Sequence, residues 1–142
     1  MFLGEYEYKI DQKGRLAIPT EFRKGFMEGI VLARGLEKCI AVYPLPEWEK
    51  IAQRLVTLPP TRSKARRINR FPFATAFNLD FDGQGRIALP PPLRQYAEIK
   101  DTVIIAGVNN YLEIWSEESW ESEEVLMSEE AWQITESMET RS

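Results

Sequence analysis

Short apolar runs rich in β-forming residues recur along the chain in two series, and each series ends in a helical pattern. The first series covers residues 5–10, 16–18, 30–33 and 40–43. The second series covers residues 75–81, 87–89, 103–106 and 112–115. After the first series Trp48, Ile51 and Leu55 fall on one face at helical spacing, and after the second Trp120 begins the corresponding helix. Each series therefore predicts four short strands and a closing helix.

The two series are copies of one sequence unit. Residues 9–19 align with residues 80–90 at an offset of 71, and residues 30–48 align with residues 102–120 at an offset of 72. One inserted residue reconciles the two offsets, which indicates a tandem duplication. A single copy, with a core of about 45 residues, is too small to fold alone without disulfides or metal. We therefore expect the copies to close onto each other around a pseudo-two-fold axis.

The predicted fold class is α+β, mainly β: an intertwined pseudo-two-fold β-barrel with short flanking helices. Residues 1–57 are assigned to the first repeat and its C-terminal helix. Residues 58–71 are assigned to a basic linker or helix, because Pro59-Pro60 ends the preceding helix. Residues 72–142 are assigned to the second repeat and its acidic C-terminal helices.

Each copy contains an Asp-x-x-Gly-Arg turn between its first two predicted strands. Gly14 and Gly85 supply the positive φ that a tight hairpin requires. Asp11 and Asp82 stand where a carboxylate accepts hydrogen bonds from the N–H groups of the turn. We interpret these four residues as structural parts of the turns and expect the two turns in symmetry-related positions.

The arginine that ends each turn, Arg15 or Arg86, allows two interpretations. It could pair with the aspartate of its own turn and only fix the turn, or it could present its guanidinium to a ligand. An exposed ion pair contributes only about 0–1 kcal/mol to stability. We therefore favour the functional interpretation for both arginines.

The composition excludes most enzyme designs. The chain has no histidine and one cysteine, so Ser/His and Cys/His nucleophile systems, an internal disulfide and a Cys-cluster metal site are excluded. A pair of aspartates, Asp11 and Asp82, is the remaining enzymatic possibility, by analogy with aspartic proteases. Each is followed four residues later by an arginine that would keep it ionised. We predict that the protein is not an enzyme and uses no cofactor or metal.

Charge is divided unequally along the chain. The net charge is −4, but residues 1–71 carry +6 and residues 72–142 carry −10. A local basic face, rather than the average, sets the field that a phosphate meets. No stretch is long and apolar enough to span a membrane, and the first residues do not resemble a signal peptide, so we expect a soluble intracellular protein.

Two charged segments keep open interpretations. The basic linker could be a solvated helix face, a partner for the Glu-rich C-terminus of a neighbouring subunit, or an auxiliary contact to phosphate. The linker residues concerned are Arg62, Lys64, Arg66 and Arg67. The acidic segment Glu113–Glu139 could be the solvated side of one or two helices, or could repel DNA from the wrong face.

Four segments together resemble the MraZ family: Met1–Tyr6, the two Asp-x-x-x-Arg motifs, and Val42–Trp48. The resemblance covers nearly the whole chain. It implies two tandem swapped-hairpin modules of the AbrB/SpoVT type. It also implies a transcriptional regulator that binds short direct repeats in double-stranded DNA upstream of the division and cell-wall gene cluster. The implied assembly is a ring-shaped homo-oligomer, cytoplasmic and associated with the nucleoid.

The resemblance also implies which residues face DNA. The arginines of the two motifs are Arg15 and Arg86, and basic residues just after Ile-Pro in the related AbrB module match Arg23 and Lys24. In the second copy Arg94 matches Arg23, but Gln84 and Gln95 replace the lysines of the first copy. We therefore expect the first copy to contribute more to DNA contact. The candidate DNA-binding residues are Arg15, Arg86, Lys13, Arg23, Lys24 and Arg94. The alternative function is a non-enzymatic oligomeric scaffold or an antitoxin-like module.

Overall fold

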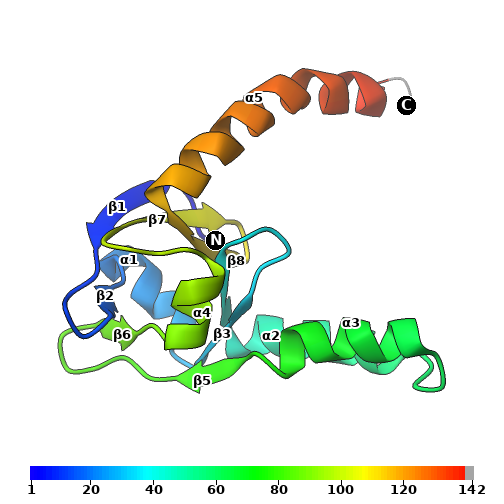
Figure 1. Ribbon diagram of the computed structural model, residues 1–142, viewed down its shortest axis with the longest axis horizontal. Helices are drawn as coiled ribbons and strands as arrows, with labels where there is room; N and C mark the ends of the chain where they lie inside the picture. The colour runs from blue at the N-terminus through cyan, green and yellow to red at the C-terminus, as the bar shows by residue number, and fades with distance from the viewer. Residues whose placement is uncertain (140–142) are drawn as a thin grey trace.

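One large antiparallel sheet organises the chain in the computed structural model, which describes residues 1–139 (Figure 1). The strands are β1 (Glu5–Lys9), β2 (Arg15–Ala17), β3 (Ile30–Arg34), β4 (Ile40–Pro44), β5 (Phe77–Leu79), β6 (Arg86–Ala88), β7 (Thr102–Val108) and β8 (Tyr111–Ser116). The helices are α1 (Thr20–Arg23), the 3-10 turn η1 (Lys24–Phe26), α2 (Leu45–Val56), α3 (Ser63–Phe73), α4 (Pro91–Tyr96) and α5 (Glu117–Glu139). Helices and strands are therefore mixed, as expected.

The two repeats exchange strands within the six-stranded sheet, whose order is β1-β7-β8-β4-β3-β5. β1 of the first repeat pairs with β7 of the second, and β5 of the second pairs with β3 of the first. The hairpins β3–β4 and β7–β8 meet in the middle through β4 and β8. A separate two-stranded ribbon joins β2 to β6, again one strand from each repeat. Neither repeat therefore has a complete sheet of its own.

The expected closed barrel is wrong. The six-stranded sheet is open, with β1 and β5 as its edges, and β2 and β6 pair only with each other. A barrel closes only when each edge strand finds a hydrogen-bonded neighbour. Here the strands that could bridge the edges are three residues long and form their ladder with one another. The β2–β6 ribbon therefore covers the sheet without closing it.

The hydrophobic core lies between the ribbon and the sheet, and both repeats contribute to it. Leu16 and Ile87 stand opposite each other in the ribbon, and both are buried. They belong to a cluster with sheet residues of both repeats, among them Leu32, Ile105 and Ile114. The duplication predicts a core of this kind, because one repeat alone could not bury enough apolar surface.

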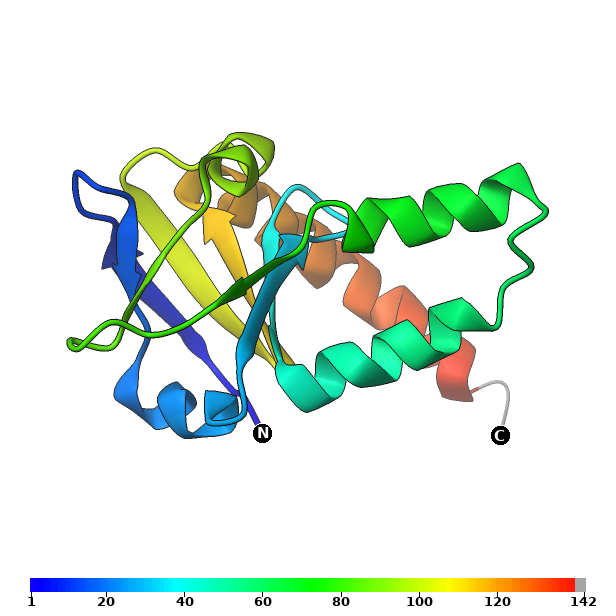
Figure 2. The same ribbon diagram turned by 90° about the horizontal axis from the view of Figure 1, so that it is seen from below.

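Three helices, α2, α3 and α5, extend the molecule beyond the strands (Figure 1). α2 and α3 form an antiparallel hairpin that projects from the body (Figure 2), and α5 leaves the body in a different direction (Figure 1). The expectation of short flanking helices is wrong for α5, which is a single helix of 23 residues. Within residues 1–139 no helix has the length and apolar character needed to cross a membrane.

The shared core predicts that the two repeats unfold together. Leu16→Ala and Ile87→Ala each remove a buried side chain, and each should lower the free energy of unfolding by about 2–5 kcal/mol. Denaturant unfolding followed by circular dichroism and by tryptophan fluorescence should give one coincident transition for both variants. Two separate transitions, one of them unaffected by the substitution, would show that the repeats are independent.

Candidate nucleic-acid interface

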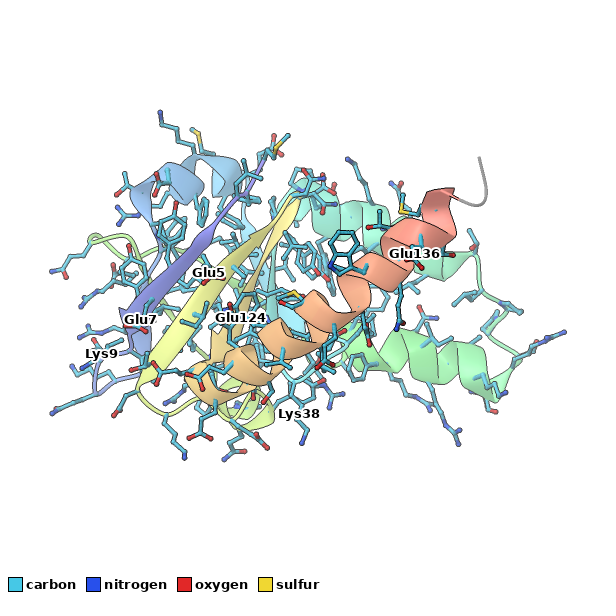
Figure 3. The ribbon with its side chains drawn as sticks, turned by 90° about the horizontal axis from the view of Figure 1, so that it is seen from above. Glu5, Glu7, Lys9, Lys38, Glu124 and Glu136 are labelled. Carbon is cyan, nitrogen blue, oxygen red and sulfur yellow. The ribbon has the colours of Figure 1, made fainter. Side chains whose placement is uncertain are left out.

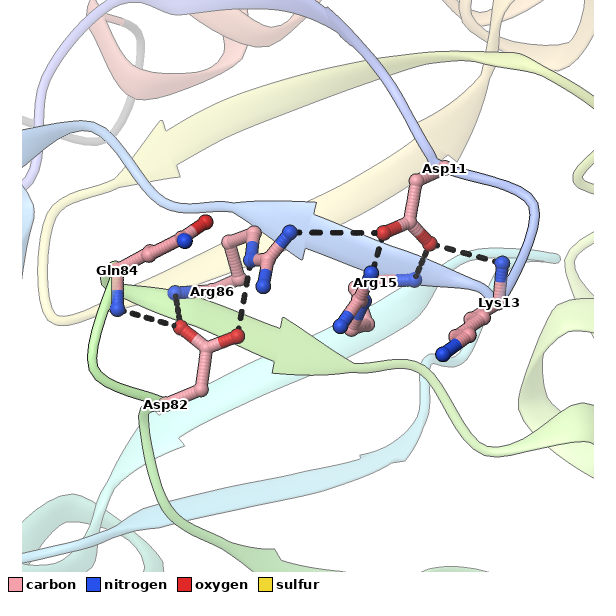
Figure 4. Close-up of polar contacts among 6 residues, drawn as sticks. All are labelled: Asp11, Lys13, Arg15, Asp82, Gln84 and Arg86. Carbon is pink, nitrogen blue, oxygen red and sulfur yellow. Dashed lines mark hydrogen bonds and ion pairs between the residues drawn. The ribbon is translucent and has the colours of Figure 1, made fainter.

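The first Asp-x-x-Gly-Arg turn is closed by its aspartate (Figure 4). Oδ1 of Asp11 accepts hydrogen bonds from the backbone N–H groups of Lys13 and Arg15, both at 2.9 Å. The N–H of Gly14 donates to the carbonyl of Asp11 at 3.0 Å, and Gly14 has φ +76°. A side chain with a Cβ rarely adopts that backbone conformation, which explains the glycine.

The second turn repeats this geometry (Figure 4). Oδ1 of Asp82 accepts from the N–H groups of Gln84 at 2.8 Å and Arg86 at 3.0 Å. Gly85 has φ +73°, and its N–H donates to the carbonyl of Asp82 at 3.0 Å. The sequence of each turn thus dictates its local shape, and the two shapes match.

The arginines of the two turns lie on one face of the ribbon. Leu16 and Ile87 point into the core, so by the alternation of a strand Arg15 and Arg86 lie on the outer face. Nε of Arg15 donates to Oδ2 of Asp11 at 2.6 Å, and Nε of Arg86 donates to Oδ2 of Asp82 at 2.8 Å. Nη1 of Arg86 also lies 3.6 Å from Oδ2 of Asp11, across the repeats. The side chains remain 34% and 25% exposed.

The electrostatics of the turns keep both carboxylates charged. The pKa of Asp11 is lowered, chiefly by the hydrogen bond from the backbone N–H of Arg15, with partial desolvation opposing it. The pKa of Asp82 is lowered in the same way, chiefly by the backbone N–H of Arg86. Two aspartates that share a proton, as in aspartic proteases, need one raised pKa. Here the pKa values of both aspartates are lowered, so the two carboxyl groups do not form a proton-sharing pair of that kind.

Arg23 and Arg94 hold the two turns against each other. Nε of Arg23 donates to the carbonyl of Ile18 at 2.9 Å, and Nε of Arg94 donates to the carbonyl of Leu89 at 3.0 Å. The guanidinium of Arg23 lies against Gly85, and that of Arg94 lies against Gly14, so each arginine contacts the turn of the other repeat. Sequence reasoning missed this contact. The sequence feature that could have indicated the contact is that each arginine stands four residues after the proline of its repeat.

The remaining basic candidates are divided between two ends of the molecule. Lys13 lies in the first turn and Lys24 follows α1, and both are exposed. The basic residues of the linker are also exposed, but they lie on or beside α3 in the projecting hairpin, away from the ribbon (Figure 1). These linker residues are Arg62, Lys64, Arg66 and Arg67. The structure therefore brings the two turns together and leaves the linker apart.

Fold and site together define a class of protein: a tandem-repeat β-sheet protein in which one Asp-x-x-Gly-Arg turn from each repeat forms a common face. The family model described as "MraZ protein, putative antitoxin-like" matches the chain twice, over residues 1–71 and 73–141. The chain belongs to the MraZ family.

Several relatives that carry the name transcriptional regulator MraZ are similar to nearly the whole chain. The relative from Dehalococcoides mccartyi strain BAV1 is 52% identical over 140 residues, which cover 98% of this chain and 99% of the relative. The relative from Herpetosiphon aurantiacus is 50% identical over 86% of this chain and 85% of its own length. The relative from Thermomicrobium roseum is 42% identical over 99% of both chains. The name that these relatives carry describes transcriptional regulators, which are not a class of enzyme.

The contact between Gly85 and Arg23 predicts a position-specific effect of alanine. Gly85→Ala places a Cβ at positive φ, which costs about 1–2 kcal/mol, and it also displaces the guanidinium of Arg23. Gly83→Ala in the same turn is the matched control, because its Cβ meets nothing within 4 Å. In thermal unfolding, the free energy of unfolding should fall clearly for Gly85→Ala and should change by no more than about 0.5 kcal/mol for Gly83→Ala. Equal losses would contradict the assigned contact.

The lowered pKa values of Asp11 and Asp82 predict how acid affects stability. A carboxylate whose pKa is lowered by folding stabilises the folded state above the unfolded pKa of about 3.9, and this contribution is lost as pH falls through the folded pKa. Asp11→Asn with Asp82→Asn keeps an acceptor oxygen but removes the titration. The free energy of unfolding should then fall less steeply below about pH 4 than in the unmodified chain. Denaturant titrations at a series of pH values measure this, and unchanged steepness would refute it.

Proposed function

We propose that this protein is a sequence-specific DNA-binding transcriptional regulator whose ribbon face lies on double-stranded DNA. The observation that carries the proposal is that Arg15 and Arg86, one from each repeat, lie on the same outer face of the ribbon. The names of the relatives support a regulatory role. The targets we propose are short direct repeats upstream of the division and cell-wall gene cluster, and the place of action is the cytoplasmic nucleoid.

The aspartates prepare the arginines for this contact. Each carboxylate accepts a hydrogen bond from Nε, so it holds the guanidinium by one edge. The terminal nitrogens of Arg15 and Nη2 of Arg86 are the donors left for a guanine edge or a phosphate, because Nη1 of Arg86 lies 3.6 Å from Oδ2 of Asp11. A fork that is already oriented loses less side-chain entropy on binding. Asp11 and Asp82 therefore act as positioning residues for Arg15 and Arg86.

Other basic residues have graded roles in this proposal. Lys13 and Lys24 are exposed, and they contact phosphates beside the ribbon. Arg23 and Arg94 act mainly by fixing the two turns relative to each other, because each donates to a carbonyl of its own repeat and touches the opposite turn. Lys13 has no basic counterpart at Gln84, so the first repeat contributes more to binding.

The proposed assembly is a ring-shaped homo-oligomer of chains with the assigned parts 1–57, 58–71 and 72–142. The exchange of strands between the repeats supports the swapped-hairpin description of the AbrB/SpoVT modules. A ring presents several ribbon faces, and direct repeats present several sites, so each further contact benefits from a high effective concentration. Isolated ribbon faces should bind weakly.

The second candidate function is an interaction scaffold or antitoxin-like module without DNA binding. The antitoxin-like wording of the family description favours it, as does the long exposed helix α5. Assembly of the chain combined with no affinity for DNA at moderate salt would select this alternative.

The proposal predicts that binding depends on the two turn arginines. Arg15→Ala with Arg86→Ala should weaken binding to a duplex from the region upstream of the protein's own gene by at least about tenfold for each arginine. Where the contacts are to phosphate, the slope of log K against log salt should also fall by roughly 0.9 per lost contact. Gel-shift titrations at several salt concentrations measure both quantities.

The control for this experiment removes two positive charges elsewhere. Lys50 and Arg54 are exposed on α2, in the hairpin that projects away from the ribbon (Figure 2). Lys50→Ala with Arg54→Ala changes the net charge equally, so binding should stay near that of the unmodified chain. If the two double variants weaken binding equally, the ribbon face is not the DNA-binding site.

A further inference from the structure

The two turns of the ribbon have the same shape, but they hold their arginines differently (Figure 4). Nε of each arginine donates to the aspartate of its own turn, at 2.6 Å for Arg15 and 2.8 Å for Arg86. Nη1 of Arg86 is also paired with Asp11, at 3.6 Å from Oδ2. Among residues 1–139, no carboxylate pairs with a terminal nitrogen of Arg15. Asp11 therefore pairs with both arginine side chains, whereas Asp82 pairs only with Arg86.

This difference leaves the two guanidinium groups with unequal sets of donors. Both terminal nitrogens of Arg15 stay available, and its side chain is 34% exposed. Arg86 is 25% exposed, and only its Nη2 is clear of a carboxylate. An arginine that recognises guanine uses two donors of one guanidinium, which meet O6 and N7 of the same base. Arg15 has such a pair of donors, whereas the single terminal nitrogen of Arg86 suits one phosphate oxygen.

The charges around the turns differ in the same sense. Residues 9–15 have a net charge of +2, and the aligned residues 80–86 have a net charge of −1. Lys9 ends β1 beside the first turn (Figure 3). The differing pairs, all exposed, are Lys9 with Asp80 and Lys13 with Gln84. DNA attracts the positive turn more strongly than the negative one, so the first turn is favoured for close approach to the bases.

Unequal turns give the ribbon a direction. The pairing of β2 with β6 relates the two turns by a half turn about the middle of the ribbon, where Leu16 lies opposite Ile87. The backbone of a DNA duplex has a two-fold symmetry of its own, so two identical turns would fit a site in either of two opposite directions. A base contact made by one turn only removes that equivalence. A recognition sequence that differs from its reverse complement is then bound in one direction.

We propose that Arg15 reads a base pair while Arg86 anchors the DNA backbone, so that each chain lies on its site in one direction. Arg15 is the specificity-determining residue, with its two terminal nitrogens on a guanine edge. Arg86 places Nη2 on a phosphate, and Asp11 sets the difference because it pairs with Nη1 of Arg86. This division of roles rests on the proposed function, since it applies only where the ribbon face lies on DNA.

Two variants that keep the charge separate the roles of the arginines. Arg15→Lys and Arg86→Lys each retain a positive charge, but lysine lacks the planar pair of donors. Each variant is titrated against the duplex from the region upstream of the protein's own gene, and against a shuffled duplex of the same length and composition. The specificity ratio is the affinity for the first duplex divided by the affinity for the second. Circular dichroism verifies that each variant is folded.

The expected effects of the two variants are different. Arg15→Lys should lower the specificity ratio by at least about tenfold, because the paired contact to guanine is lost. Arg86→Lys should change the ratio by less than about threefold, because lysine also neutralises a phosphate. Arg86→Ala should weaken binding to both duplexes by a similar factor, and the slope of log K against log salt should fall by roughly 0.9.

A cutting probe tests the direction of binding. An iron chelate attached to a cysteine generates hydroxyl radicals that cut the DNA nearby. Gln12→Cys and Gly83→Cys place the chelate at equivalent positions of the two turns, and the native Cys39 is buried. The two probes should cut on opposite sides of the protected site. Adding Arg15→Lys should make each probe cut on both sides, whereas adding Arg86→Lys should leave the pattern unchanged.

The outcomes separate this division of roles from the proposed function. Equal losses of the specificity ratio in the two lysine variants, or a larger loss for Arg86→Lys, would overturn it while the ribbon remains the DNA site. Cutting on both sides by each probe in the otherwise unmodified chain would also overturn it. If neither lysine variant changes the ratio but Arg15→Ala with Arg86→Ala weakens binding, both arginines contact only the backbone and the division is wrong. If that double alanine variant binds normally, the proposed DNA site itself fails.

Discussion

The antiparallel pairing of β2 with β6 is the interaction on which the rest of the structure depends. It places Leu16 and Ile87 over the sheet, where they complete a core that neither repeat could build alone. The same pairing brings Arg15 and Arg86 to a common outer face. Stability and the proposed recognition surface therefore come from one ribbon, with its inner positions used for packing and its outer positions for ligand contact.

Local sequence patterns predicted the local structure well. The Asp-x-x-Gly-Arg turns and the strands beside them follow from hydrogen bonding, backbone preference and alternation within a few residues. Barrel closure was not predictable in the same way, because it depends on which edges find partners across the whole molecule. The roles of Arg23 and Arg94 were also missed, since their contacts with Gly85 and Gly14 join positions that are 62 and 80 residues apart in the sequence.

The two ends of the molecule differ in the charged side chains that they expose. The ribbon carries the two oriented arginines, whereas the basic hairpin projects from the body away from the ribbon (Figure 1). The sequence showed basic residues in the turns and in the linker, but it did not show that the two groups lie apart. Their separation depends on where the fold places α3 relative to the ribbon (Figure 1). In the proposed assembly, a weakly binding face that is repeated from chain to chain would give this acidic protein, with a pI of about 5.0, a high effective concentration of contacts to DNA.

The crossed contacts of Arg23 and Arg94 have a consequence for how the duplicated halves can change over time. Each half supplies the side chain that fills the space above the other half's glycine, so a substitution in one half alters the fit of its sister. Substitutions at these positions in one repeat are therefore restricted by the other repeat. A repeat from another protein could replace one half only if it carried the matching arginine. The duplication has made two once-equivalent units dependent on each other.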